Sequence, residues 1–485
     1  MEYQKNLKDK VLNGLVWSFL ERIAAQGVSF IVSVLLARLL LPSEYGAVSL
    51  VLVFIALANV FVSTGLGESL VQKSNADETD FSTMFYISLI TGILLYGILF
   101  IVAPFVGTFY KMPELVLVLR VLALKIPISA ISTIQHAYVS KHMMFKRFFW
   151  STLGGTLISG IIGIAMAYKG AGVWALVFQY LTNTLIDTIV LFFTVDWRPK
   201  LLFSVKSAKE LFNFGWKIVA ANLVNTTYSE ARSLIIGSVY TAADLAFYNK
   251  GMQFPSLAIT NIDSAIGKVA FPAMVQVKDE PARLKQVGRR AMKTTSYIIF
   301  PLMMGLAMVA EPVVRLLLTD KWILAVPYVQ LGCLFYACQP IQTTNWQIIK
   351  AMGRSDLCFK LEIVKKIIGL TLLFGTMKLG PLAIAVSGAL FGVISMLINI
   401  APNKTLIGYS YKEQFYDLLP VGIMTLITAG CIYFVSRMML PTIAELILEV
   451  ITGIIVFVGL SAVSRNDSYL YLLTTIKSRF IRRKK

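Results

Sequence analysis

Residues 81–107, FSTMFYISLITGILLYGILFIVAPFVG, contain no charged side chain in 27 consecutive positions. A helix needs about 20 mostly apolar residues to cross a bilayer, because the hydrocarbon core is about 30 Å thick and each helical residue rises about 1.5 Å. This stretch therefore predicts a transmembrane helix.

Comparable apolar runs follow one another along the chain, separated by short polar loops. We predict spans at residues 12–37, 46–66, 81–107, 115–138, 148–168, 172–195, 212–239, 246–267, 294–314, 324–349, 361–379, 381–401, 416–438 and 442–463. Of the 485 residues, 57% are hydrophobic and 15% charged, whereas soluble domains have about 45–50% apolar and about 25% charged residues. The sequence thus predicts an all-α, polytopic membrane protein with about 14 transmembrane helices.

The cysteines and the net charge exclude several other classes of protein. The four cysteines, Cys333, Cys338, Cys358 and Cys431, show no CxxC spacing, so we expect free thiols and neither a disulfide framework nor a zinc site. The formal net charge of +19 lies mainly in loops and at the two ends of the chain. Because that charge is not gathered into one basic segment or domain, we expect no nucleic-acid partner.

Lysine and arginine are distributed unevenly between alternate loops. With the N-terminus inside, about 30 of the 45 basic residues lie in cytoplasmic segments and about 7 in external loops, as the positive-inside rule requires. We therefore expect a multi-pass protein of a cytoplasmic membrane with both termini in the cytoplasm. In the basic tail, Leu472, Ile476 and Phe480 recur at helical spacing, which fits either an amphipathic helix on anionic lipid or a frayed end.

An internal repeat runs through the first twelve spans with a displacement near 200 residues. In chain order, Leu12, Trp17 and Glu44 recur as Leu211, Trp216 and Asp244. Because each copy has an even number of helices, six, both copies begin on the same side of the membrane. The repeat therefore predicts two parallel six-helix lobes plus a C-terminal helix pair. The expected parts are residues 1–200 and 201–405 for the lobes, 406–465 for the pair, and 466–485 for the tail. We expect a substrate path between the lobes and alternating access.

Several predicted spans carry polar side chains at intervals of three and four, which places them on one helical face. The expected polar lining of a cavity consists of Ser18, Gln26, Asn222, Asn225 and Gln253. Such side chains also serve as contacts between packed helices. A cation at midspan costs about 2.5–3.5 kcal/mol on insertion scales, so charged residues in these spans indicate function more strongly.

The cations that we place around a water-filled cavity are Arg22, Arg120, Lys125, Arg232 and Lys250. Because they outnumber the intramembrane acids, an anionic substrate is favoured. Glu21, Glu230 and Asp263 are candidates for ion coupling, with H⁺ or Na⁺ as the ion, or alternatively act as partners of neighbouring cations.

Signatures of enzymes are missing. The sequence contains no GxxxxGK[ST], HExxH or GxSxG motif, and it has only two histidines. No predicted external loop exceeds about fifteen residues, too short for a catalytic domain. We therefore expect no catalytic residues, no metal and no cofactor, with transport driven by an ion gradient, the membrane potential or the substrate gradient.

The chain resembles the polysaccharide-transport family (Wzx-type flippases) of the multidrug, oligosaccharidyl-lipid and polysaccharide exporter superfamily. The resemblance covers most of the chain and rests on Asn13–Trp17, Leu35–Gly46, Gly65–Gly67 and Asp244–Tyr248. It implies a bacterial cytoplasmic (inner) membrane protein that exports undecaprenyl-diphosphate-linked oligosaccharide to the outer leaflet for capsule, O-antigen (lipopolysaccharide) or related polymers. It also implies two lobes around a cationic cavity and contact with polysaccharide polymerase machinery.

Three other functions are weighed against this one. A multidrug antiporter would favour an acidic cavity and usually has twelve helices, whereas a lipid II flippase fits the same scaffold. A membrane glycosyltransferase or polymerase would need acidic or histidine chemistry on a large external loop, and no such loop is predicted. A lipid-linked oligosaccharide flippase therefore remains the leading hypothesis.

Overall fold

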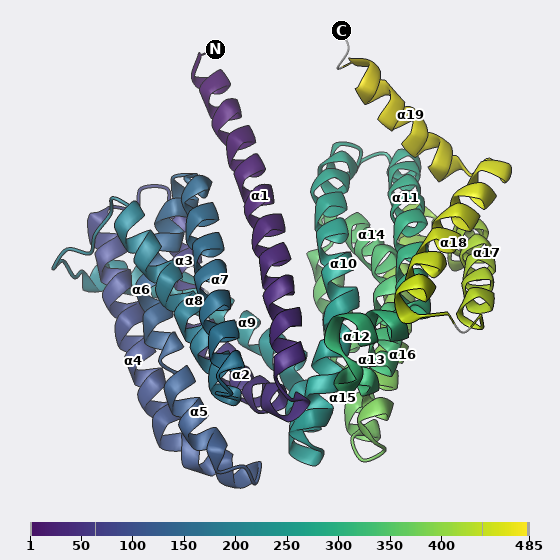
Figure 1. Cartoon of the computed structure of the whole chain (residues 1–485). Coiled ribbons are helices and arrows are strands. Elements are labelled where there is room, and N and C mark those ends of the chain that lie inside the picture. Colours follow the sequence, from purple (N-terminus) through teal and green to yellow (C-terminus); the bar gives the residue numbers. More distant parts are fainter. Residues whose placement is uncertain (1, 64, 439, 483–485) are drawn as a thin grey trace. The chain divides into compact units, whose positions relative to one another are not determined.

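The computed structural model describes the backbone of residues 2–63, 65–438 and 440–482, and their side chains except at 2–16, 18, 19, 66, 145, 261, 264–266, 268, 269 and 475–482. Helices follow one another throughout these ranges, and no β-strand occurs in them (Figure 1). The chain forms two compact units, Met1–Ala246 and Phe247–Lys485. The predicted all-α class is therefore confirmed.

The first unit contains nine helices among the described residues. They are α1 (Glu2–Leu39), α2 (Pro42–Ser63), α3 (Leu66–Gln72), α4 (Glu78–Phe109), α5 (Glu114–Leu122), α6 (Lys125–Lys141), α7 (Phe145–Tyr168), α8 (Val173–Thr194) and α9 (Val205–Val239). Helix α7 packs along α8 and α1, α4 packs along α6, and α9 packs against α2, α3 and α4. The core contains an aromatic cluster in which Phe81 meets Tyr138 and Trp197 at centroid distances of 5.5 and 5.7 Å.

The second unit contains the remaining helices of the described chain. They are α10 (Ala242–Gln276, which begins in the first unit), α11 (Pro281–Met308), α12 (Ala310–Leu318), the 3-10 helix η1 (Asp320–Ala325), α13 (Val326–Ala337), α14 (Gln339–Ala351), α15 (Ser355–Thr376), α16 (Pro381–Ile407), α17 (Tyr411–Ser436), α18 (Thr442–Val463) and α19 (Asp467–Arg482). Helices α11, α14 and α16 pack together, and α17 packs on α11 and α18. Helix α19 includes the basic segment for which an amphipathic helix was one prediction, although the side chains of Ile476 and Phe480 are not among those described.

Ten helical segments of the described chain are long and apolar enough to cross a membrane. An eleventh is the pair α11 and α12, which bends by 66°. Helices α9, α10 and α15 coincide with predicted spans but fail the same test, since polar and charged residues interrupt their apolar runs. The chain is thus a multi-pass membrane protein, while the count of fourteen spans stays a prediction.

Some predicted spans are broken helices. The span predicted at 115–138 is α5 followed by α6, and the one at 324–349 comprises η1, α13 and α14. The sequence signals for these breaks are local: Pro127 lies in the first turn of α6, and Pro340 near the start of α14. A hydropathy profile does not detect such breaks, because the residues on both sides of each break are apolar.

The repeat residues Glu44 and Asp244 have the same local role. The Glu44 carboxylate accepts a hydrogen bond from the Leu41 backbone N–H at 2.7 Å, and the Asp244 carboxylate accepts one from the Thr241 N–H at 3.1 Å. Each acid therefore binds a free N–H where its helix begins. The compact units divide after Ala246, whereas the repeat was predicted to restart at residue 201, so that boundary remains a prediction.

The connection from α8 to α9 is fixed to the start of α4. The backbone N–H of Lys200 donates to the Ser82 hydroxyl at 3.1 Å, and that of Ser204 donates to the Thr83 hydroxyl at 3.0 Å. These two backbone N–H groups lie outside regular secondary structure and would otherwise hydrogen-bond to water. The two hydroxyl groups act as their acceptors instead. The connection is consequently part of the first unit.

A cluster of charges joins the same end of α3, α4 and α9. The Lys73 ammonium lies 2.9 Å from the Asp80 carboxylate and 3.3 Å from that of Glu210. The hydrogen bond to Asp80 raises the pKa of Lys73, with a further contribution from Glu210. These ion pairs link the second turn of α9 to α4 and to the end of α3.

Candidate functional site

Three helices of the first unit, α1, α6 and α8, bring charged side chains together around Glu21. Glu21 of α1 is hydrogen-bonded to Thr152 of α7 and lies within the electrostatic influence of Arg22, His136 and Asp187. The His136 Nε2 atom lies 3.0 Å from the Asp187 Oδ2 atom, across α6 and α8. Two predicted site residues, Glu21 and Arg22, therefore belong to one charged cluster, and the histidine–aspartate pair in it was not predicted.

Lys125 and Arg120 have different surroundings. Lys125 begins α6 at the break after α5, and its ammonium lies 5.6 Å from the Tyr180 ring centroid on α8. The Arg120 guanidinium instead lies over the Phe100 ring at 4.2 Å, and its Nε donates to the Phe100 carbonyl at 3.3 Å. Phe100 is 41% exposed on α4. The structure therefore brings Lys125, but not Arg120, against α8.

The remaining predicted residues of the first unit lie on α1 and α9. Gln26 is half-buried on α1, one turn after Arg22, whereas the side chain of Ser18 lies outside the described residues. Half-buried residues on α9 are Asn222, Glu230 and Arg232, and Asn225 is exposed. The α9 residues are spread over three turns of one helix, so they form an elongated polar strip.

In the second unit, Lys250 and Asp263 have polar neighbours of their own. Lys250 of α10 is 6% exposed, and its ammonium donates to the Gln253 side-chain oxygen at 3.3 Å. The Asp263 carboxylate accepts hydrogen bonds from the Thr343 hydroxyl at 3.0 Å and from Gln339. Lys250 and Gln253 are thus brought together as predicted site residues, while hydrogen bonds from α14 stabilise Asp263 where it lies.

A buried amide network links α14, α16 and α17. The side-chain oxygen of Asn345 accepts hydrogen bonds from the amides of Asn403 at 2.8 Å and Gln414 at 3.0 Å, while its own amide donates to Gln414 at 2.9 Å. All three residues are at most 1% exposed. This network was not predicted from the sequence, although Asn399 and Asn403 recur at helical spacing. The network fixes the start of α17 to α14 and α16.

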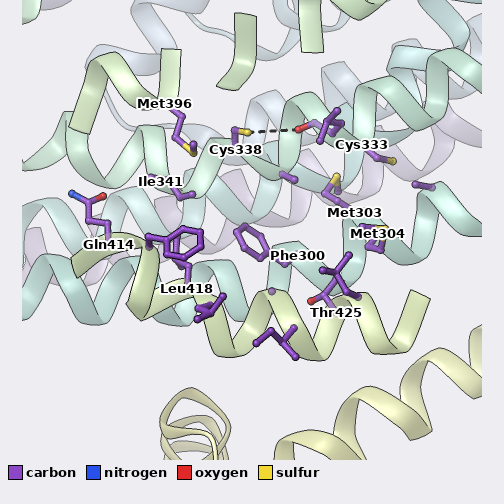
Figure 2. A pocket seen from close by; sticks show the side chains of 18 of the residues that line it. Phe300, Met303, Met304, Cys333, Cys338, Ile341, Met396, Gln414, Leu418 and Thr425 are labelled. Atoms are coloured by element: carbon purple, nitrogen blue, oxygen red, sulfur yellow. Dashed lines mark hydrogen bonds between the residues drawn. The ribbon is translucent and has the colours of Figure 1, made fainter. Parts of the chain in front are cut away.

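An apolar cavity of about 760 Å³ lies beside this network in the second unit. Its walls come from α11, α13, α14, α16 and α17, and Figure 2 shows Phe300, Met303 and Met396 among the side chains that line it. Polar groups among its lining residues are few and include Gln414 and Thr425. A pocket of this composition suits an apolar chain better than a sugar or a phosphate.

The fold and these residues define a class of protein: a multi-pass helical membrane protein with cations in its membrane spans and a large apolar cavity. The sequence of residues 35–327 matches the model of a family described as polysaccharide biosynthesis protein. That match spans more than half of the chain. The chain therefore belongs to this polysaccharide biosynthesis family.

Relatives by sequence agree with this assignment, and one solved structure shares the fold. The chain is 23% identical over 492 residues to the lipopolysaccharide biosynthesis protein WzxC of Escherichia coli (strain K12), covering 99% of this chain and 98% of that protein. It is 24% identical over 399 residues to the teichuronic acid biosynthesis protein TuaB of Bacillus subtilis (strain 168), covering 81% and 82%. The structure of the lipid II flippase MurJ in an inward closed conformation superposes with a TM-score of 0.75 at 15% identity, covering 94% and 99%. That likeness shows a shared fold.

Proposed function

We propose that the chain is a flippase that moves undecaprenyl-diphosphate-linked oligosaccharide from the cytoplasmic to the outer leaflet of the bacterial cytoplasmic membrane by alternating access. The observation that carries this proposal is membership of the polysaccharide biosynthesis family over more than half of the chain. The near-complete alignment with a lipopolysaccharide biosynthesis protein supports it. The protein acts as a transporter without catalytic residues, and both its termini are cytoplasmic.

The diphosphate is held by arginines of the first unit, first by Arg22 and later in the cycle by Arg232. A guanidinium binds phosphate oxygens through two parallel hydrogen bonds, which an ammonium does not reproduce. Arg22 is supported in this role by its exposed position next to Glu21, within the charged cluster of α1, α6 and α8. Lys125 and Lys250 supply further positive charge, and Gln26, Asn222 and Asn225 bind sugar hydroxyls.

The apolar cavity of the second unit accommodates part of the polyprenyl chain. It is lined by α11, α13, α14, α16 and α17, and two of its lining residues, Phe415 and Leu426, are more than 60% exposed. An opening edged by exposed apolar side chains in a membrane protein gives a lipid chain access from the bilayer. H⁺ or Na⁺ drives the cycle, and polymerase machinery receives the product.

The test uses bacterial cells in which the chromosomal gene is deleted and variants are supplied from a plasmid. Without the protein, surface polysaccharide should fall and its lipid-linked precursor should accumulate inside. Arg22→Gln and Arg232→Gln should reduce export roughly thirtyfold or more, since losing a charged partner costs about 2 kcal/mol or more. The lysine variants should recover part of that loss.

Arg315→Gln is the matched control, because Arg315 pairs with Glu311 and Asp320 at 3.0 and 2.9 Å at the end of α12. It should leave export unchanged. Membrane abundance is measured for every variant. If the two glutamine variants accumulate normally and export normally, the arginines do not bind the substrate. If deletion leaves the surface polysaccharide and its precursor unchanged but sensitises cells to cationic drugs, the multidrug antiporter is the better assignment.

A further inference from the structure

A buried acid lies in the middle of the apolar helix α18. Glu449 is 0% exposed, and neither of its carboxylate oxygens has a hydrogen-bond partner among the described residues. Its helix, Thr442–Val463, is one of the ten segments apolar enough to span a membrane. A buried carboxylate in such a segment normally pairs with a cation or accepts hydrogen bonds. Glu449 shows neither kind of contact within the described structure.

The charged groups of the neighbouring elements do not neutralise Glu449. On its own helix, Glu445 lies one turn earlier and is of the same sign. On α17, Arg437 binds the Tyr433 hydroxyl. On α12, Arg315 binds Glu311 and Asp320. On α11, the contact with α18 is made by Tyr297, whose hydroxyl donates to Ser461 at 2.9 Å, three turns beyond Glu449. The basic residues of α11 all precede Tyr297, and the three nearest to it contact Asp417, Asp467 and Tyr471. The other two pair with Glu280 and Glu413.

The packing around Glu449 is close. One turn later, a Cβ on Gly453 would lie 3.2 Å from Ile432 Cδ1 of α17, so the absence of a side chain there lets the two helices approach. Ile432 itself is 2% exposed. This close contact leaves water little access to the carboxyl group, and an ionised form would be both dehydrated and unpaired.

We propose that Glu449 is a proton-binding site: it holds a proton while α18 is packed on α17 and α12, and releases it when this packing opens. This proposal rests on the proposed flippase function for its role, in which the bound proton couples a proton gradient to transport. In the predicted orientation α18 begins at the outer surface, so Glu449 lies about two turns below it. Asp263, a coupling candidate from the sequence, differs because Thr343 and Gln339 already stabilise its carboxylate.

The protonation state is tested directly by infrared spectroscopy of the full chain in lipid at pH 7. The wild-type protein should show the C=O stretching band of a protonated carboxylic acid, and Glu449→Gln should remove it. Glu445→Gln is the matched control on the same helix and should retain the band. If the spectra of the wild type and Glu449→Gln contain the same carboxylic-acid intensity, the proposal is wrong. This measurement does not depend on transport.

The coupling role is tested in the cellular export assay with and without a protonophore. In wild-type cells, collapse of the proton gradient should slow export. In cells with Glu449→Gln, the two rates should be equal, because the amide neither binds nor releases a proton. If protonophore slows export by the same factor in both, the coupling role is refuted. If wild-type cells show no export at all, the flippase assignment fails, while the infrared result still decides whether Glu449 binds a proton.

Discussion

Replacing Asn345 by leucine should destabilise the second unit through the buried amide network. Leucine is similar in size but offers no hydrogen bond, so the Gln414 side-chain oxygen loses its donor at 2.9 Å. The amides of Asn403 and Gln414 keep weaker bonds to backbone carbonyls at 3.1 and 3.4 Å. One orphaned buried acceptor costs about 1–3 kcal/mol, which corresponds to a fall in melting temperature of about 2–12 °C for a unit of this size.

The assay is thermal unfolding of detergent-solubilised protein with a thiol-reactive dye, because the buried thiols of Cys333 and Cys338 lie in the same unit. The double variant Asn345→Leu/Gln414→Leu should be less destabilised than the sum of the single variants, since the Gln414 oxygen that Asn345→Leu leaves without its donor is then absent. Gln276→Leu, an exposed glutamine at the end of α10, is the control and should shift the transition little. Strict additivity of the two network substitutions would refute the reasoning.

The remaining predictions concern topology, pH and a single arginine. A cysteine at Asp279 should resist external labelling in intact cells while one at Leu379 reacts; the reverse result would invert the orientation. Tyr409→Phe removes a hydrogen bond to Asp417 and should cost about 1.5–3 kcal/mol at pH 7. Burial and Asp417 raise the pKa of Tyr409, so its contribution is fully present below pH 10 and falls progressively as the pH rises from there toward the raised pKa. The variant should therefore lose less stability than the wild type from pH 10 to 12. Arg120→Gln should leave export nearly unchanged, because the Arg120 guanidinium contacts a half-exposed ring on α4. A loss of export as large as that of Arg22→Gln would show that Arg120 binds the substrate, as the sequence predicted.

Much of the fold follows from the sequence because hydrophobic length is a direct requirement of the bilayer. The run at 81–107 lies within α4, and the one at 442–463 coincides with α18. The repeat acids Glu44 and Asp244 were found by spacing alone, and each binds the backbone in the same way. Breaks such as the one between α5 and α6 were missed, because they interrupt the hydrogen-bonding pattern without changing composition.

The candidate site was less predictable, since helical spacing shows which side chains share a face but not which helix that face meets. Arg120 and Lys125 lie five residues apart, yet one contacts α4 and the other α8. Glu449 was overlooked because Glu445 and Glu449 are the only charged residues of an otherwise apolar helix, and their spacing does not show that Glu449 is buried while Glu445 is not. Its lack of a partner is visible only in the packed structure.

The anchored connection between α8 and α9 also offers a practical handle. Leu201 is 95% exposed and lies between Lys200 and Ser204, whose backbone groups are fixed to α4. A fluorophore or an antibody epitope attached there would be held by backbone that is hydrogen-bonded to α4, so it would move less than one attached to a flexible loop. In single-molecule or cryo-electron microscopy experiments, such a fiducial would report displacements of the first unit without adding its own motion.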